Sequence, residues 1–408
     1  MNRRILLLAC LFILSAMLHA QADDAPLIVS KAAVLMDSST GTLLFYKNPD
    51  EEIPPASLTK LMTMHLVLRE AEAGRLSLSK KISPPRQSWA RNQPSRSSLM
   101  HLAEGQELTI NDLMLGLAVP SGNDAAVAVA LQLAPSVDSF VAMMNEAASK
   151  LGLEKTHFVE PSGISEYNMT TAREFASFCR FYVETYPQAL KNYHSVETFS
   201  YPRAENVAEI FRENPGTITQ SNHNSLLVGG RDTNNRFVEK FEGVDGLKTG
   251  YIDESGPNIA LTALRDGTRF IAVILGAPAE WRGDRIRDED GRRLLAWAFN
   301  HYKTVRPQLP ELEQARVWKG KTNFAGLAPS LPLDFTSLKE RANRLYWKTE
   351  LIDPLIAPLP SGSPAGELIL SDDQGELRRI PLLTTEDIEK GNFFKRLWDS
   401  IRLFFRKK

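Results

Sequence analysis

Pro55-Ala56-Ser57-Leu58-Thr59-Lys60 is the most informative stretch of this 408-residue chain. Its serine stands three residues before its lysine, and an apolar-periodic run follows from Leu61 to Leu68. In a helix that opens at Ser57, Lys60 lies one turn later on the same face, so its amine can reach the serine hydroxyl. A serine hydroxyl is a weak nucleophile at neutral pH and needs a neighbouring base. A lysine whose pKa is lowered by burial or by a second cation can be that base.

Two further short motifs support a catalytic interpretation of this stretch. Ser-x-x-Lys alone is common, and a helix cap followed by a solvated lysine is the plain alternative. However, Ser121-Gly122-Asn123 follows 64 residues later, and Lys248-Thr249-Gly250 follows 127 residues after that. The three elements in this order are typical of class A β-lactamases and penicillin-binding proteins. They predict an active-serine acyl-transfer site.

The residue types in these motifs match the requirements of acyl transfer, which are a nucleophile, a base, a proton path and an oxyanion site. We expect Ser57 to attack a carbonyl carbon and Lys60 to accept its proton. Ser121 can relay that proton to the leaving amine, and Asn123 can hold Lys60 or the substrate amide. The backbone N–H groups of Ser57 and Tyr251 are the predicted oxyanion donors.

The third motif is predicted to bind the substrate. Lys248 adds positive charge, which helps to lower the pKa of Lys60 and attracts a carboxylate. Thr249 can hydrogen-bond that carboxylate, and Gly250 lets a substrate backbone approach the strand closely. An extended peptide can then pair with the strand by β-addition, next to Tyr251.

The periodicity of the chain favours an α+β fold. Two strands are predicted at 31–37 and 42–46, before a block of helices. Three more are predicted at 243–251, 258–264 and 269–275, before a helix at 285–302. The run from Phe270 to Leu275 is apolar without alternation, which is typical of a buried central strand. We expect helices packed around a mostly antiparallel sheet, whereas residues 187–240 give no clear prediction.

The composition changes after about Val305, where prolines separate short alternating runs. We predict a peptidase domain at 23–304, a small β-rich domain at 305–387 and an amphipathic helix at 388–408. Residues 392–408 carry six basic side chains and one acid, with aromatic residues at helical spacing. This pattern favours a helix that lies in an anionic membrane interface, although a helix packed on the domain is an alternative.

The N-terminus has the three parts of a signal peptide. Arg3 and Arg4 precede an apolar core from Ile5 to Leu18, and Ala20-Gln21-Ala22 is a cleavage site. Residues 1–22 are therefore predicted to direct export. Removing them leaves Cys179 as the only cysteine, so no disulfide is expected.

Other classes of chemistry find little support. There is no P-loop, no Gly-x-Gly-x-x-Gly and no His-x-x-x-His spacing, so we expect no metal and no cofactor. The formal net charge is −1 and the charges are well mixed, so nucleic acid is not an expected partner. His157 and His223 are expected to make structural hydrogen bonds.

The three motifs, with the flanking Asp124-Ala125 and Asp245-Gly246-Leu247, resemble those of D-alanyl-D-alanine carboxypeptidases of the penicillin-binding protein 5/6 type. The resemblance extends to Ser97-Ser98-Leu99-Met100 and to Gly391-Asn392-Phe393-Phe394, and covers essentially the whole mature chain. It implies a β-lactamase/transpeptidase-like domain, a periplasmic location and peripheral attachment to the inner membrane. It also implies removal of the terminal D-Ala from peptidoglycan pentapeptide stems through an acyl-enzyme on Ser57, with β-lactam antibiotics as inhibitors.

One position departs from the family pattern. Relatives often have His and then Thr after Lys-Thr-Gly, where this chain has Tyr251-Ile252. The backbone N–H of residue 251 is unaffected by this change. Side-chain contacts to the substrate carboxylate or to the deacylating water are expected to differ.

Three alternative functions remain open at this point. A class A β-lactamase shares the motifs but needs a glutamate-activated water, and no Glu-x-x-Leu-Asn loop precedes Lys248. A D,D-endopeptidase would use the same site on a larger leaving group. An alternative of another class is a catalytically weak, membrane-tethered protein that binds the cell wall.

Overall fold

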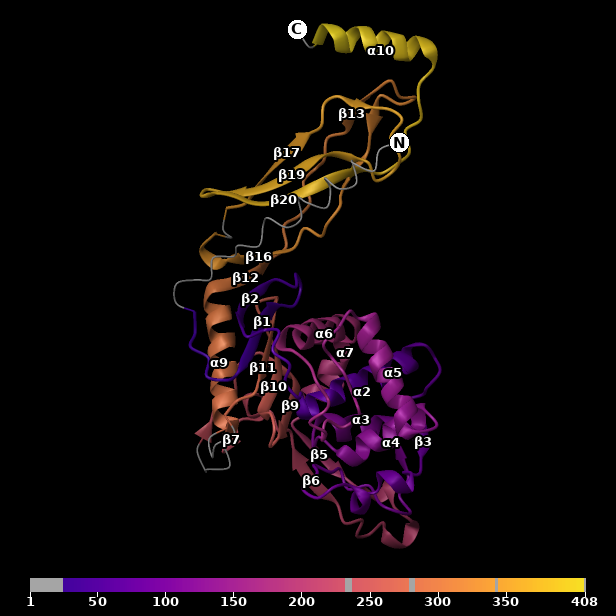
Figure 1. Cartoon of the computed structure of the whole chain (residues 1–408), viewed down its shortest axis with the longest axis vertical. Coiled ribbons are helices and arrows are strands. Elements are labelled where there is room, and N and C mark those ends of the chain that lie inside the picture. The colour runs from indigo at the N-terminus through magenta and orange to yellow at the C-terminus, as the bar shows by residue number, and fades with distance from the viewer. Residues whose placement is uncertain (1–24, 232–236, 279–282, 342–343, 407–408) are drawn as a thin grey trace. The chain divides into compact units, whose positions relative to one another are not determined.

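The computed structural model describes residues 25–231, 237–278, 283–341 and 344–406 (Figure 1). The chain divides into two compact units, one ending at Asn300 and the other beginning at His301. The predicted signal peptide at 1–22 lies outside the described residues.

A five-stranded antiparallel sheet forms the centre of the first unit, with the strand order β2–β1–β11–β10–β9. Its strands are β1 (Ala32–Asp37), β2 (Leu43–Lys47), β9 (Val244–Ile252), β10 (Gly256–Arg265) and β11 (Thr268–Leu275). The strand that carries Lys248-Thr249-Gly250 is β9, which lies at one edge of the sheet. The predicted central position of the apolar strand β11 is confirmed.

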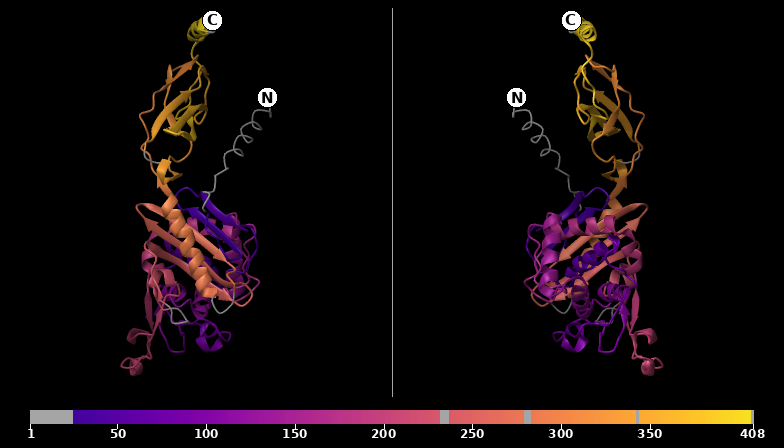
Figure 2. Two further views of the ribbon diagram at one scale, coloured as in Figure 1. Left: turned by 90° about the vertical axis from the view of Figure 1, so that its left-hand side faces the viewer. Right: turned by 90° about the vertical axis from the view of Figure 1, so that its right-hand side faces the viewer.

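Helices cover both faces of this sheet (Figure 2). On one face, α9 (Gly283–His301) packs its Phe299 against Phe270, with ring centroids 4.9 Å apart. On the other face, Ile271 joins the main hydrophobic cluster, to which α6 (Ala172–Thr185) contributes Phe175 and other side chains. Successive residues of β11 therefore bury opposite faces, which explains why its sequence does not alternate.

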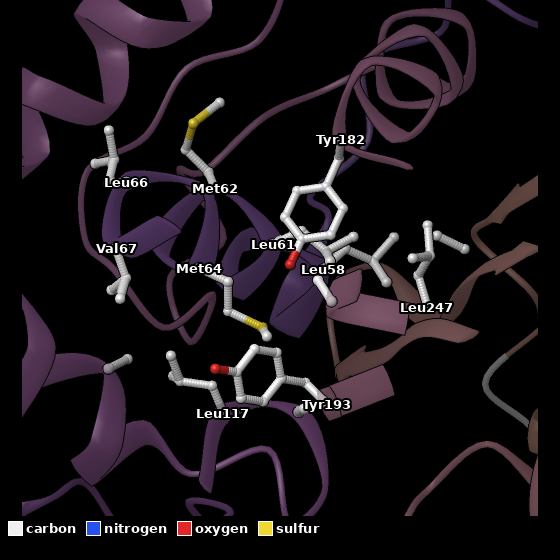
Figure 3. Packing of buried hydrophobic residues seen from close by; sticks show 14 of the residues in the cluster. Leu58, Leu61, Met62, Met64, Leu66, Val67, Leu117, Tyr182, Tyr193 and Leu247 are labelled. Carbon is white, nitrogen blue, oxygen red and sulfur yellow. The ribbon is translucent and has the colours of Figure 1, made fainter. Parts of the chain in front are cut away.

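The remaining helices of this unit form a block beside the sheet. They are α2 (Lys60–Glu72), α3 (Ile110–Ala118), α4 (Asn123–Leu133), α5 (Val137–Lys150) and α7 (Pro187–Ala189). The short helix α8 (Ser225–Val228) lies instead against β9 and α9. Every residue of α2 from Lys60 to Leu68 is buried. Leu58, in the turn before this helix, and Leu61, in its first turn, lie near Tyr182 and the sheet residue Leu247 (Figure 3). A helix surrounded by core in this way holds its first turn in a fixed place.

Two-stranded sheets complete the unit, including the stretch 187–240, for which there is no clear prediction. They pair β3 (Lys81–Ile82) with β4 (Leu108–Thr109), β5 (Thr198–Tyr201) with β6 (Ile218–Ser221), and β7 (Gly230–Arg231) with β8 (Phe237–Val238). Among the described helices, none is long and apolar enough to cross a membrane alone. Only α4 and α5 together pass that test, across a bend of 88°.

The second unit is a small β domain followed by a helix, as predicted. A four-stranded sheet has the order β15–β20–β19–β17, and three-stranded and two-stranded sheets accompany it. The strands are β12 (Tyr302–Val305), β13 (Ala315–Trp318), β14 (Phe324–Ala325), β15 (Leu327–Pro329), β16 (Phe335–Leu338), β17 (Tyr346–Leu351), β18 (Leu355–Ile356), β19 (Pro364–Asp372) and β20 (Gly375–Thr384). The C-terminal helix α10 spans Phe393–Arg406.

Candidate active site

Ser57 lies in a tight 3-10 turn, Ala56–Thr59, that leads directly into α2. Two glycines from other parts of the chain press against this turn. A Cβ atom on Gly163 would lie 1.9 Å from the carbonyl oxygen of Ala56, and one on Gly250 would lie 2.9 Å from the backbone nitrogen of Ser57. The turn Ala56–Thr59, called the nucleophile turn below, is therefore packed between the 160–165 loop and the edge strand β9.

Lys60 is fully buried and donates to three acceptors. Its Nζ atom lies 2.8 Å from Ser57 Oγ, 2.7 Å from Asn123 Oδ1 and 2.5 Å from the carbonyl oxygen of Ser162. A neutral amine has only two N–H groups. If Asn123 and Ser162 accept those two, the lone pair of the amine faces the hydroxyl of Ser57.

Burial lowers the pKa of Lys60 to about 7. The negative charges of Glu160 and Asp124 act in the opposite direction and raise this pKa. The lysine is therefore poised to exchange a proton near neutral pH, as a general base requires. Of the two causes expected from the sequence, burial and a second cation, burial has the largest effect on the pKa of Lys60.

Asn123 is the first residue of α4 and joins Lys60 to a neighbouring loop, because its Nδ2 atom donates to Ser97 Oγ over 3.2 Å. The next residue, Asp124, fixes that loop by accepting from the backbone nitrogens of Met100 and Leu102, at 2.9 and 3.0 Å. The start of α4 thus positions both the side-chain amide of Asn123 and the 97–102 loop that faces it.

Ser121 lies in the turn between α3 and α4 with a φ of 61°, and its side chain is buried. Within the described part of the chain, its hydroxyl has no hydrogen-bond partner. The hydroxyl is therefore not committed to holding the turn together. It remains available to a bound substrate.

Lys248 and Thr249 are both buried on β9, and Lys248 Nζ donates to the carbonyl oxygen of Thr249 over 3.0 Å. Burial, and then repulsion by Lys60 and Arg287, hold the pKa of Lys248 far below its usual range. Arg287 of α9 was not foreseen from the sequence, because no motif contains it. It is buried beside Asp288, at 2.8 Å, and also pairs with Asp284 over 3.0 Å, so these two carboxylates balance its charge near β9.

A cleft opens over Ser57 between β9 and the 95–98 loop. The Arg96 guanidinium lies 3.2 Å from the carboxylate of Asp253, which also accepts a 2.6 Å hydrogen bond from the hydroxyl of Tyr251. All three side chains line the cleft. Tyr251, the residue that departs from the family pattern, is thus held by Asp253 just after β9. The sequence does not predict this contact.

Glu160 is the acidic residue that faces Lys60, but its hydrogen bonds stay within its own loop. Its carboxylate accepts from the backbone nitrogens of Ser162 and Gly163, at 2.7 and 2.6 Å, and from Asn168 Nδ2 at 2.7 Å. This network orients the Ser162 carbonyl toward Lys60. The sequence signal for it is the turn-forming Pro161-Ser162-Gly163, which was not interpreted as part of the site.

The structure corrects the interpretation of two histidines. The side chains of His157 and His223 are exposed, and neither has a side-chain hydrogen bond with the described residues. Among the described residues, no group of three or more His, Cys, Asp or Glu side chains could hold a metal ion.

Comparison with known proteins agrees with this geometry. Residues 19–279 match the family described as D-alanyl-D-alanine carboxypeptidase, and residues 303–390 match the penicillin-binding protein 5 C-terminal domain. The chain is 31% identical over 403 residues to the D-alanyl-D-alanine carboxypeptidase DacC of Escherichia coli, covering 97% of this chain and 94% of the relative.

Solved structures show the same similarity. Penicillin-binding protein 5 from Haemophilus influenzae superposes with a TM-score of 0.76 at 29% identity, covering 90% of this chain and 99% of the other. Penicillin-binding protein D2 from Listeria monocytogenes, in a cefotaxime-bound form, superposes with a TM-score of 0.55 at 27% identity, covering 67% and 98%. With its Ser57–Lys60 pair and its β domain, the chain belongs to the serine-type D-alanyl-D-alanine carboxypeptidases of the penicillin-binding protein 5/6 type.

Proposed function

We propose that this carboxypeptidase removes the terminal D-Ala of peptidoglycan pentapeptide stems through an acyl-enzyme on Ser57, with Lys60 as the base. The observation that carries these assignments is the buried Lys60 amine, which lies 2.8 Å from Ser57 Oγ and is held by two other acceptors. A pKa of about 7 leaves much of this amine neutral at physiological pH.

In the first step, neutral Lys60 takes the hydroxyl proton as Ser57 Oγ attacks the carbonyl carbon of the penultimate D-Ala. The oxyanion that forms is stabilised by the backbone N–H groups of Ser57 and Tyr251. The close approach of Gly250, the residue before Tyr251, to the Ser57 nitrogen supports this assignment. Ser121 relays the proton from Lys60 to the leaving amine of the terminal D-Ala. Water then hydrolyses the acyl-enzyme and restores Ser57.

Substrate binding is assigned to the open edge of β9. An extended stem peptide adds to this edge by backbone hydrogen bonds, beside the close approach of Gly250 to Ser57. The terminal carboxylate meets the side chains of Lys248 and Thr249, which both belong to β9. Asn123 holds Lys60 and contacts the substrate amide.

The decisive experiment measures D-alanine release from a diacetyl-Lys-D-Ala-D-Ala peptide, with and without preincubation with penicillin. The cefotaxime-bound Listeria relative supports the expectation that a β-lactam acylates the same serine. We expect release that penicillin blocks, and we expect the Ser57→Ala variant to lose both release and penicillin labelling. Turnover in that variant would move the nucleophile elsewhere, and rapid penicillin hydrolysis by the intact enzyme would revive the β-lactamase alternative.

We further propose that the enzyme acts in the periplasm and is attached peripherally to the outer face of the inner membrane. The predicted signal peptide supports export, and α10 supports attachment, because seven of its large apolar side chains are exposed. They are Phe393, Phe394, Leu397, Trp398, Ile401, Phe404 and Phe405. Truncation after Glu389 should release the mature protein from membranes with catalysis kept, and a truncated protein that still sediments with membranes would contradict the attachment.

A further inference from the structure

The helix α10 is docked on the β domain through its single acid. Asp399 is buried, and its carboxylate accepts from the backbone nitrogen of Lys319 over 2.7 Å and from Lys395 Nζ over 2.5 Å. Arg406, at the other end of the helix, donates to Asp353 over 2.9 Å. Through these side-chain contacts the anchor helix adjoins the β domain within the second unit.

A groove lined by cations and aromatic rings lies along this contact. Arg316 and Trp318 of β13 form one wall, and Trp398, Arg402 and Arg406 of α10 form the other. The guanidinium carbons of Arg316 and Arg406 lie 4.2 and 5.8 Å from the centre of the Trp318 ring. The guanidinium of Arg402 lies 5.3 Å from the centre of the Trp398 ring. Each wall thus presents a cation against an indole.

The charge in this groove is only partly neutralised. Arg406 is paired with Asp353, whereas Arg316 and Arg402 form no ion pair within 4 Å among the described residues. Asp353 and Asp399 lie near Arg316 and balance part of the positive charge of the three arginines. Guanidinium groups that are planar and stacked on aromatic rings suit the oxygens of a phosphate, which they can contact through two N–H groups at once. The groove therefore favours an anion that carries such oxygens.

The neighbouring surface indicates where this anion comes from. Trp398, Ile401 and Phe405, which line the groove, are also exposed members of the apolar face of α10. In an interfacial helix such a face enters the boundary between headgroups and acyl chains, which places the groove at the depth of the lipid phosphates. The arginines and the apolar side chains can then contact the same lipid.

We propose that this groove binds the phosphate of an anionic phospholipid, so that the anchor recognises a headgroup as well as inserting its apolar face. The inference rests on the membrane attachment proposed above and assigns a binding role to Arg316, which lies outside the helix. Attraction between a basic residue and an anionic membrane strengthens binding about fivefold for each residue near the surface. Guanidinium groups that are stacked on indole rings add to the affinity for phosphate, because they hold two N–H donors in a fixed plane, whereas a simple charge does not.

The test measures binding of the mature full-length protein to vesicles of phosphatidylcholine, with and without phosphatidylglycerol. We expect Arg316→Ala to weaken binding to the anionic vesicles at least about fivefold. Arg344→Ala is the matched control, because it removes an exposed arginine of the same domain that pairs with Asp373 and does not line the groove. This control should change binding less than about twofold, and D-Ala release should be unchanged in both variants.

A third variant distinguishes a specific phosphate site from general electrostatic attraction to the membrane. Arg316→Lys keeps the charge but loses the planar fork, so it should recover only part of the lost affinity. Full recovery in Arg316→Lys, equal effects in Arg316→Ala and Arg344→Ala, or equal binding of the intact protein to both vesicle types would each overturn the proposal. Saturable quenching of tryptophan fluorescence by inorganic phosphate without vesicles would overturn the lipid assignment in favour of a soluble anion.

The truncation after Glu389 distinguishes failure of this inference from failure of the attachment. A truncated protein that stays on membranes would contradict the attachment itself. Release of the truncated protein, together with unchanged binding of Arg316→Ala, would contradict only the phosphate site.

Discussion

Lys60 shows how burial converts an ordinary lysine into a base. Because burial lowers its pKa to about 7, the neutral amine becomes abundant only above that pH. We expect the rate of acylation by a fluorescent penicillin to rise with pH through about 7 and then level off. A rate that is independent of pH across this range would contradict the role of Lys60 as the base.

The same shift in the pKa of Lys60 makes the free energy of unfolding depend on pH. The folded-state pKa of Lys60 lies below its ordinary value of 10.5, so the unfolded chain binds more protons between about 7 and 10.5. The contribution of this group to the free energy of unfolding therefore rises with pH across that window. Burying the base costs stability at neutral pH, and the surrounding hydrogen bonds offset part of this cost.

Gly163 is a second residue on which the site depends. It has a φ of 86°, and a Cβ atom there would overlap the carbonyl oxygen of Ala56. We expect Gly163→Ala to displace the nucleophile turn and to reduce penicillin acylation by at least about a hundredfold. The control is Gly152→Ala, which has a similar φ of 72° but no atom within 4 Å of the added carbon. Both variants carry the backbone strain of about 1 kcal/mol, so similar acylation rates in the two would contradict this packing of the nucleophile turn.

At the scale of elements, the sequence was most informative where function depends on short, fixed spacing. The Ser57–Lys60 contact follows from helical geometry, and the central position of β11 follows from its apolar run. The carbonyl of Ser162 could not be foreseen, because every residue has a carbonyl and only the path of its loop brings this one to Lys60. The hairpins between 187 and 240 have strands of two to four residues, too short for a periodic signal.

The docking of α10 includes a buried hydrogen bond to one side chain, Asp399, and this contact is testable. We expect Asp399→Ala to leave the backbone N–H of Lys319 without its acceptor and to weaken docking by about 2 kcal/mol, which is typical of a lost hydrogen bond to a charged group. Faster hydrogen exchange at Lys319 and faster proteolysis before α10 would report this. Asp387→Ala is the control, because it removes an exposed acid that accepts from Ser361 instead. Equal protection of α10 in both variants would contradict the docking.

At the scale of the whole molecule, each unit has hydrophobic clusters of its own. The main cluster surrounds α2 and draws its residues from the first unit, whereas Val317, Leu355 and Ile388 belong to a cluster within the second. Both the catalytic residues and the cleft belong to the first unit. A covalent ligand on Ser57 should therefore stabilise one unit and leave the stability of the other unchanged.

This separation predicts two thermal transitions for the mature protein, of which penicillin raises only one. Calorimetry with and without penicillin measures both midpoints in one sample, and Ser57→Ala should show no shift in either. Truncation after Glu389 should lower only the transition that penicillin leaves in place, because α10 docks on the second unit. A single transition that moves as a whole with penicillin would instead mean that the two units unfold together, and that acylation at Ser57 is energetically coupled to the anchor domain.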